Sequence, residues 1–148
     1  MSLRKAENFV LKDQFNNDFE LYKNLDKNVL LIFYPRDNSL VCSIQLENYQ
    51  NNTPRFEAAG IKLVGINKGS VGSHKSFCNG KNIEFPVLSD LNAEVSRKFK
   101  ALNIFSVNKR KLVLINKSGE IVYERNTPSF FYLDTDKIME ELHSGNII

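Results

Sequence analysis

The sequence predicts an α/β protein in which a mixed β-sheet is covered by helices on both faces. Short apolar runs with the composition of buried strands, such as 29–34 and 61–66, alternate with segments of helical periodicity. Near its end the chain has two strand-like stretches joined by a tight turn. Helical crossovers join parallel strands, whereas a tight turn joins antiparallel ones, so the sheet is expected to be mixed.

Residues 9–25 are expected to form a β-hairpin at the N-terminus. Two alternating apolar stretches, 9–11 and 19–21, flank the turn sequence 16–18, which is Asn-Asn-Asp. A short helical turn is expected over 21–25. We find no repeat or linker, and 148 residues suit one domain, residues 1–148.

The centre of the expected fold is the stretch that leads to Cys42. Residues 29–34 form an unbroken apolar run rich in β-branched and aromatic side chains, the pattern of a strand buried on both faces. Pro35 ends this strand, and Ser39 is a good N-cap for a helix. Cys42 is therefore expected near a helix N-terminus, where free N–H groups and the helix dipole favour a thiolate.

The helix after Ser39 is expected to run toward Ala59 with a break at 51–53, because Pro54 interrupts it. Gly60 suits the position after its C-cap. The rest of the chain predicts strands and helices in these ranges: strand 61–66, helix 70–79 ended by Gly80, strand 85–88, helix 91–102, strand 111–115, turn 116–119, strand 120–125 and helix 134–143.

The bulk composition narrows the class of protein. Twenty basic and 17 acidic residues give a net charge of +3, which is too small an excess to indicate a nucleic-acid partner. No stretch approaches the ~20 apolar residues of a membrane span, and the N-terminus lacks the apolar core of a signal peptide. Two cysteines do not suggest a secreted disulfide scaffold. We therefore expect a cytoplasmic protein without a nucleic-acid or membrane partner.

The cysteines allow several interpretations. A lone cysteine is usually a small buried apolar residue, but Cys42 follows a proline-containing loop with hydroxyl and cationic neighbours, a setting that makes a thiol reactive. Cys78 is far from Cys42 in sequence, so only folding could bring them together. His74, Phe77 and Cys78 share one face of their helix.

Four ordered segments resemble one known family. Residues 33–42, with Pro35, Ser39 and Cys42, resemble the Pro-x-x-x-Thr/Ser-x-x-Cys active-site loop of the peroxiredoxins. In particular, they resemble the bacterioferritin comigratory protein or PrxQ branch of the AhpC/TSA family. Residues 6–9, 85–90 and 110–116 are similar to three further segments of that branch. The resemblance implies a thioredoxin-like fold and a peroxidase that needs no metal or organic cofactor.

The resemblance also implies roles for individual residues. Cys42 would be the peroxidatic cysteine, which attacks a hydroperoxide and becomes a sulfenic acid. Ser39 would hold the peroxide, Pro35 would shield the sulfur, and Arg110 would stabilise the thiolate and the leaving oxygen. Without the resemblance, the position of Arg110 between two lysines would favour a solvated charge. The departures from the branch are Leu40-Val41 in place of Pro-Gly and Gln45 in place of Glu.

Cys78 decides the expected catalytic cycle. In the branch, a resolving cysteine lies either five residues after the peroxidatic one, where this chain has Glu47, or on the helix after the next strand. The second position matches Cys78. The resemblance therefore implies an atypical two-cysteine enzyme whose Cys42–Cys78 disulfide is reopened by thioredoxin or a similar dithiol. A monomer or weak homodimer is expected.

Other functions remain open at this point. Cys78 could be a packing residue, which would leave a one-cysteine peroxidase dependent on an external thiol. The same fold could also serve as a non-catalytic interaction module. A zinc site could combine His74 and Cys78 with Cys42 and His143, although the spacing is not that of structural zinc sites. A thioredoxin-type oxidoreductase is disfavoured because no second cysteine follows Cys42 in a Cys-x-x-Cys motif.

Overall fold

The computed structural model describes residues 3–148, and its elements follow the expected order. The strands are β1 (Val10–Lys12), β2 (Asp18–Glu20), β3 (Asn28–Phe33), β4 (Ile61–Asn67), β5 (Val87–Ser89), β6 (Arg110–Ile115) and β7 (Ile121–Thr127). The helices are the 3-10 turn η1 (Leu21–Asn24), α1 (Leu40–Asn51), α2 (Thr53–Ala58), α3 (Val71–Lys81), α4 (Glu94–Lys98) and α5 (Thr135–Ser144).

Within the described residues, the strands form one seven-stranded sheet in the order β2-β1-β5-β4-β3-β6-β7. Strands β3, β4 and β5 pair in parallel, because helical segments connect them. The β1–β2 hairpin pairs antiparallel, and so do β3–β6 and β6–β7. The predicted mixed sheet with an N-terminal hairpin is therefore confirmed.

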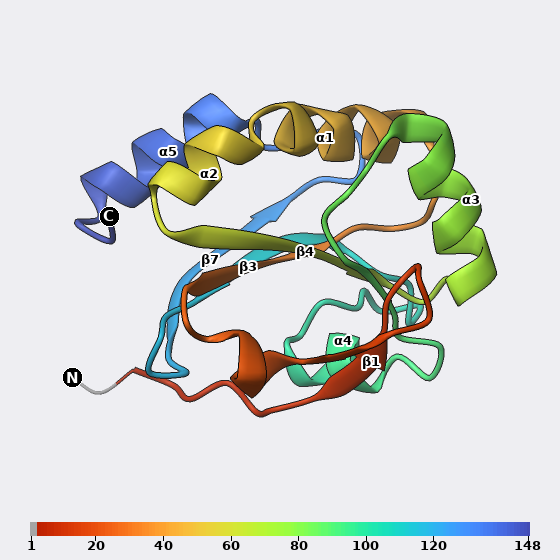
Figure 1. Cartoon of the computed structure of the whole chain (residues 1–148), viewed down its shortest axis with the longest axis horizontal. Helices are drawn as coiled ribbons and strands as arrows, with labels where there is room; N and C mark the ends of the chain where they lie inside the picture. Colours follow the sequence, from red (N-terminus) through yellow and green to blue (C-terminus); the bar gives the residue numbers. More distant parts are fainter. Residues whose placement is uncertain (1–2) are drawn as a thin grey trace.

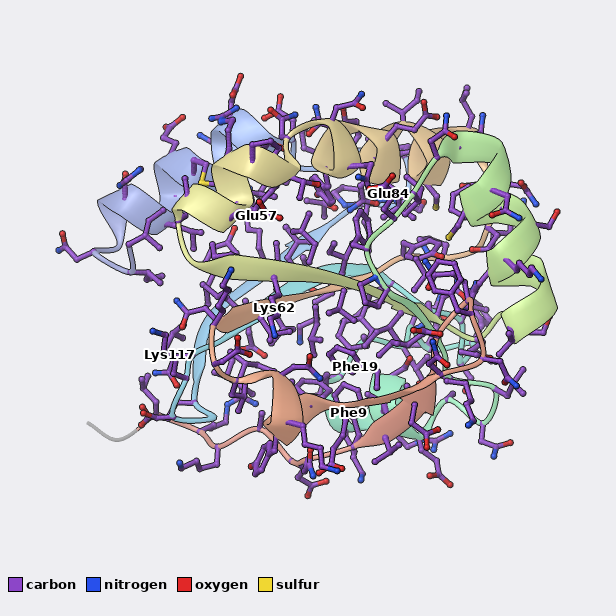
Figure 2. All side chains as sticks on the ribbon, viewed as in Figure 1. Phe9, Phe19, Glu57, Lys62, Glu84 and Lys117 are labelled. Carbon is purple, nitrogen blue, oxygen red and sulfur yellow. The ribbon has the colours of Figure 1, made fainter. Side chains whose placement is uncertain are left out.

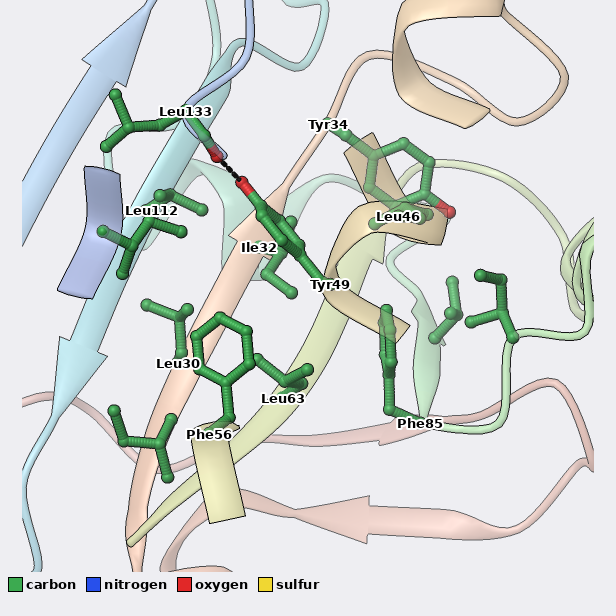
Figure 3. Close-up of a cluster of buried hydrophobic side chains, with 14 of the residues drawn as sticks. Leu30, Ile32, Tyr34, Leu46, Tyr49, Phe56, Leu63, Phe85, Leu112 and Leu133 are labelled. Atoms are coloured by element: carbon green, nitrogen blue, oxygen red, sulfur yellow. Dashed lines mark hydrogen bonds between the residues drawn. The ribbon is translucent and has the colours of Figure 1, made fainter. Parts of the chain in front are cut away.

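Helices cover both faces of the sheet, as predicted. Helices α1, α2 and α5 lie along one face, and α4 lies on the opposite side together with β1 (Figure 1). The alternation of side chains along β3 explains this arrangement. Leu30 and Ile32 point into the cluster beneath the α1, α2 and α5 layer (Figure 3), whereas Leu31 and Phe33 belong to the cluster on the other face.

The N-terminal hairpin supplies aromatic side chains to the second cluster. Phe9 and Phe19 lie near each other (Figure 2), with ring centroids 6.4 Å apart. Phe99 from the end of α4 meets Phe9 edge-to-face at 6.1 Å. The hairpin is thereby held to the sheet by packing as well as by strand pairing.

The break predicted at 51–53 lies at Asn52, between α1 and α2. Pro54 lies in the first turn of α2, where its missing N–H leaves no intrahelical bond unmade. Gly60 follows with a φ of 73°, which confirms its expected position after the helix.

Two predicted helix bounds were wrong. Helix α3 continues through Gly80 to Lys81, because Asn82 takes the left-handed cap conformation with a φ of 55°. The helix predicted over 91–102 is only α4, five residues long. The Asp90 carboxylate accepts hydrogen bonds from the backbone N–H groups of Val95 and Ser96 in the first turn of α4, so the helix begins at Glu94 and not at residue 91.

Among residues 3–148, no helix combines the length and the apolar character that crossing a membrane requires.

Candidate active site

Cys42 lies in the first turn of α1, at the place expected from the sequence. Ser39 is the N-cap, and its Oγ accepts a hydrogen bond from the Cys42 backbone N–H at 3.2 Å. The Cys42 side chain is fully buried in the cluster between the sheet and the helices. The positive end of the helix dipole therefore acts on this thiol without screening by water.

Sheet register brings Arg110 to the same place. Strands β3 and β6 run antiparallel, with Phe33 opposite Lys111. Arg110, the first residue of β6, is therefore level with Tyr34, where β3 ends and the Cys42 loop begins. Its Nη1 lies 3.3 Å from Cys42 Sγ, and the side chain is 3% exposed. Arg110 is thus a buried charge beside the sulfur and not a solvated one.

A chain of hydrogen bonds fixes the Arg110 guanidinium. Nη1 also donates to Gln45 Oε1 at 2.6 Å, and Nη2 donates to the Ser129 carbonyl at 2.8 Å. Gln45 Nε2 donates to Tyr49 Oη, which in turn donates to the Leu133 carbonyl at 2.6 Å (Figure 3). Residues on α1 and on the loop before α5 thereby set the direction of the guanidinium.

One polar atom of the site has no partner. Arg110 Nε is buried and makes no hydrogen bond to any residue that the structure describes. A buried N–H without an acceptor is unfavourable by about 1–3 kcal/mol.

Cys78 lies on α3 in the same hydrophobic cluster as Cys42, and both are free thiols. Burial, together with the nearby Asp37 carboxylate, raises the pKa of the Cys78 thiol to about 12. The pKa of the buried Tyr34 hydroxyl is also raised, by burial, by Asp37 and by negative charge at either cysteine. Tyr34 therefore lies within electrostatic reach of both thiols.

Pro35 and His74, which the sequence analysis also singled out, have surroundings of their own. Pro35 is half-buried two residues after the end of β3, and its shielding role stays a prediction. His74 is buried, but its Nδ1 lies 2.7 Å from Asp37 Oδ2 and its Nε2 lies 3.1 Å from the Leu88 carbonyl. Within residues 3–148, no three His, Cys, Asp or Glu side chains gather closely enough to hold a metal ion. Both ring nitrogens of His74 thus already have partners in this structure.

Sequence reasoning gave no role to Asp37 or Tyr49. Asp37 was visible inside the motif around Cys42, but nothing local shows that its carboxylate faces α3. Tyr49 has the helical spacing of a core residue, and only the fold reveals that its hydroxyl reaches Gln45 and Leu133.

A mixed sheet of this order, with a cysteine in the first turn of α1 facing a buried arginine, defines a thiol protein of the thioredoxin-like class. The chain belongs to the AhpC/TSA family, whose pattern matches residues 3–124. It is 29% identical over 140 residues to "Peroxiredoxin Q, chloroplastic" of Triticum aestivum, covering 91% of this chain and 64% of that protein. The corresponding protein of Sedum lineare is 30% identical over 139 residues, with 90% and 75% covered.

A solved structure has the same fold. "Peroxidoxin BcpB" of Mycobacterium tuberculosis superposes with a TM-score of 0.85 at 21% identity, covering 99% of this chain and 97% of that one. This likeness confirms the expected thioredoxin-like fold. The chain spans less than two thirds of the length of the Triticum aestivum relative.

Proposed function

We propose that this chain is a thiol-dependent peroxidase that reduces hydrogen peroxide and organic hydroperoxides. The observation that carries the proposal is the 3.3 Å contact between Arg110 Nη1 and Cys42 Sγ at a buried helix N-terminus. A cation and a helix N-terminus both stabilise a thiolate, which is the nucleophilic form of cysteine. Membership of the AhpC/TSA family supports the same reaction.

In the first step the Cys42 thiolate attacks one oxygen of the hydroperoxide. An S–O bond forms, the O–O bond breaks, and the second oxygen leaves and takes a proton to become an alcohol or water. Cys42 is oxidised to sulfenic acid. Arg110 would stabilise the negative charge that develops on the leaving oxygen, because its guanidinium is already held in place by Gln45 and Ser129.

The unpaired Nε of Arg110 is a donor suited to a peroxide oxygen. Ser39 would add a hydroxyl beside the substrate, and Pro35 would limit the approach of water to the sulfur. Because Cys42 is fully buried, substrate access requires the surrounding loop side chains to move apart.

A groove beside the site supports organic hydroperoxides as substrates. It has a volume of about 600 Å³ and is lined largely by apolar side chains, including Val41, Ile44, Phe130 and Phe131. Val41 directly precedes Cys42, and Phe130 follows Ser129, whose carbonyl binds Arg110. An apolar substituent of a hydroperoxide could lie in this groove while its peroxide group faces the sulfur.

The second step makes this an atypical two-cysteine enzyme in our proposal. Cys78 condenses with the Cys42 sulfenic acid to an intramolecular disulfide, and thioredoxin or a similar dithiol reopens it by thiol exchange. Both cysteines lie in helices, so the disulfide requires local unwinding. Gly72 and Gly80 would make unwinding of α3 easier.

The cellular setting is part of the same proposal. We infer that the protein acts in the cytoplasm as a monomer or weak homodimer, with no nucleic acid or membrane as partner. If Cys78 proves to be only a packing residue, the enzyme becomes a one-cysteine peroxidase that depends on an external thiol.

Peroxide consumption tests the proposed function. Wild-type protein, Cys42→Ser and Cys78→Ser are each supplied with hydrogen peroxide and, separately, cumene hydroperoxide, with dithiothreitol or thioredoxin as reductant. We expect wild type to consume both peroxides, Cys42→Ser to consume neither, and Cys78→Ser to lose turnover with thioredoxin. Equal, near-zero consumption by all three proteins would favour a non-catalytic interaction module.

A further inference from the structure

Asp37 lies at the centre of a buried polar cluster between the Cys42 loop and helix α3. Its Oδ2 accepts a hydrogen bond from Ser73 Oγ at 2.6 Å and lies 2.7 Å from His74 Nδ1. Its Oδ1 accepts a hydrogen bond from Tyr34 Oη at 2.6 Å. The Asp37 and His74 side chains are 4% and 0% exposed. We call the contact of Asp37 with Ser73 and His74 the Asp37 clamp.

His74 ties the clamp to a second segment of the fold. Its second ring nitrogen, Nε2, lies 3.1 Å from the Leu88 carbonyl, which can only accept a hydrogen bond. An ionised Asp37 carboxylate also only accepts. Whichever ring nitrogen carries a proton therefore faces an acceptor. The clamp resists opening, because the buried Asp37 carboxylate would lose its hydrogen-bond partners in a medium of low dielectric.

The loop between β4 and α3 fits closely around the clamp. A Cβ atom on Gly69 would lie 2.8 Å from His74 Cε1 and 2.9 Å from Asn67 Oδ1, which is too close for any other residue type without displacement. Asn67 Oδ1 in turn accepts a hydrogen bond from the Gly69 backbone N–H at 2.7 Å. The Asp37 clamp and the close packing at Gly69 thus both hold the first turn of α3.

The clamp joins the two segments whose cysteines must meet. Asp37 belongs to the loop that leads into Cys42, and His74 lies one helical turn before Cys78. While the clamp is closed, the Asp37 charge and burial keep the Cys78 thiol protonated, as its raised pKa indicates. A protonated thiol is a poor nucleophile, so the closed state does not favour disulfide formation.

We propose that Asp37 is a positioning residue for disulfide formation: with His74 and Ser73 it clamps the Cys42 loop to α3, and Cys78 reaches the Cys42 sulfenic acid only after the clamp opens. This inference rests on the proposed function, since it requires Cys78 to be the resolving thiol. The clamp thereby delays the second step of the cycle without taking part in the first.

The step that the clamp controls is a substitution at sulfur. Once the clamp is open, the Cys78 thiol loses its proton to water, and the resulting thiolate attacks the sulfur of the Cys42 sulfenic acid. An S–S bond forms, the S–O bond breaks, and the departing hydroxide takes a proton to leave as water. The Cys78 sulfur is oxidised and the Cys42 sulfur is reduced to the disulfide level, so no further oxidant is needed.

Single-turnover kinetics on the full chain test the clamp. Fully reduced protein is mixed with one equivalent of hydrogen peroxide and quenched at intervals with dimedone, and intact mass gives the amounts of sulfenic acid and disulfide. In Asp37→Asn the charged hydrogen bonds are weakened, so we expect the sulfenic acid to convert to disulfide about tenfold faster than in wild type. Ser73→Ala removes one neutral donor and should give a smaller acceleration, about threefold.

Ser76→Ala is the matched control, because Ser76 is an exposed residue of the same helix outside the clamp. It should leave the conversion unchanged. A substitution that disturbed the Cys42 site as a whole would instead slow the formation of the sulfenic acid. The clamp is contradicted if the sulfenic acid converts to disulfide no faster in Asp37→Asn than in Ser76→Ala. If Asp37→Asn fails to fold, the same comparison is made with Ser73→Ala. Sulfenic acid that forms in wild type but never becomes disulfide overturns the resolving role of Cys78, and the clamp with it. Absence of sulfenic acid and disulfide in every variant overturns the peroxidase itself.

Discussion

Arg110 Nη1 lies 3.3 Å from Cys42 Sγ, although 68 positions separate the two residues in the chain. The antiparallel register of β3 and β6 produces this contact, because it places the start of β6 beside the end of β3. The cysteine comes from a helix N-terminus and the arginine from a sheet. Two rigid elements therefore polarise the thiol, which supports the proposed role of Cys42 as the reactive group.

Replacing Arg110 with Met should slow sulfenic acid formation by about 100-fold or more, because a charged donor at the developing oxyanion is lost. The measurement is the second-order rate constant for the first equivalent of hydrogen peroxide. Lys109→Met is the control, since it removes a neighbouring positive charge on a residue that is only partly buried. Similar rate constants for the two variants would mean that net charge, and not the Arg110 contact, activates Cys42.

Tyr49→Phe should destabilise the protein by about 1–3 kcal/mol, because the Leu133 carbonyl and the Gln45 amide both lose a buried partner. Urea unfolding measures this change. Tyr132→Phe is the control, because the Tyr132 hydroxyl makes no hydrogen bond within residues 3–148, and its effect should stay within about 0.5 kcal/mol. An equal loss in both variants would show that the Gln45–Tyr49–Leu133 chain contributes nothing specific.

Two glycines near α3 should respond to alanine in opposite directions. Gly69→Ala forces the new methyl group against His74 and Asn67, so we expect a loss of about 1–3 kcal/mol. Gly80 lies inside α3 with nothing within 4 Å of an added Cβ, so Gly80→Ala should stabilise the protein by about 0.5–1 kcal/mol. Thermal and urea unfolding measure both. Equal shifts in the same direction would contradict the packing described around the clamp.

Acid should weaken the contribution of Asp37 to stability. Burial alone would raise the pKa of this carboxyl, but hydrogen bonds from His74, Ser73 and Tyr34 outweigh burial and hold the pKa below its ordinary value. The stabilisation is therefore fully present above pH ~4, the ordinary Asp value, and is lost as the pH falls through the lower folded-state value.

Asp37→Asn should accordingly be less stable than wild type at pH 7, and the difference should shrink below pH ~4. Urea unfolding at a series of pH values gives this comparison. Asp136→Asn is the control, because the Asp136 side chain is 82% exposed and should matter little at any pH. A difference between Asp37→Asn and wild type that grew in acid would contradict the hydrogen-bonded state of this carboxylate.

The parts of the fold that depend on local sequence could be predicted. The apolar run of β3, the Ser39 cap and the break before Pro54 follow from neighbouring residues, and the structure has all three. The bounds of α3 and α4 could not be predicted in the same way. Gly80 and residues 91–93 are compatible with more than one conformation. The left-handed conformation of Asn82 sets the end of α3, and the Asp90 carboxylate sets the start of α4.

The site was predictable only in part, because some of its contacts depend on the fold and not on neighbouring residues in the chain. Cys42 and its helix N-terminus are local features, whereas the burial of Arg110 depends on sheet register and on Gln45 and Ser129. Only the family resemblance indicated a catalytic role for Arg110, because its flanking lysines suggest a solvated charge. The pairing of Asp37 with His74 joins a loop to a helix across the strand end, and no periodicity in the chain reveals it.

The most direct test of the account is the intact mass of fully reduced protein after one equivalent of hydrogen peroxide, without reductant, for wild type and Cys78→Ser. We predict that wild type loses two hydrogens, as a Cys42–Cys78 disulfide requires, and that Cys78→Ser gains one oxygen instead. Oxygen addition in both proteins would contradict the resolving role of Cys78. No rapid change of mass in either would contradict the peroxidase.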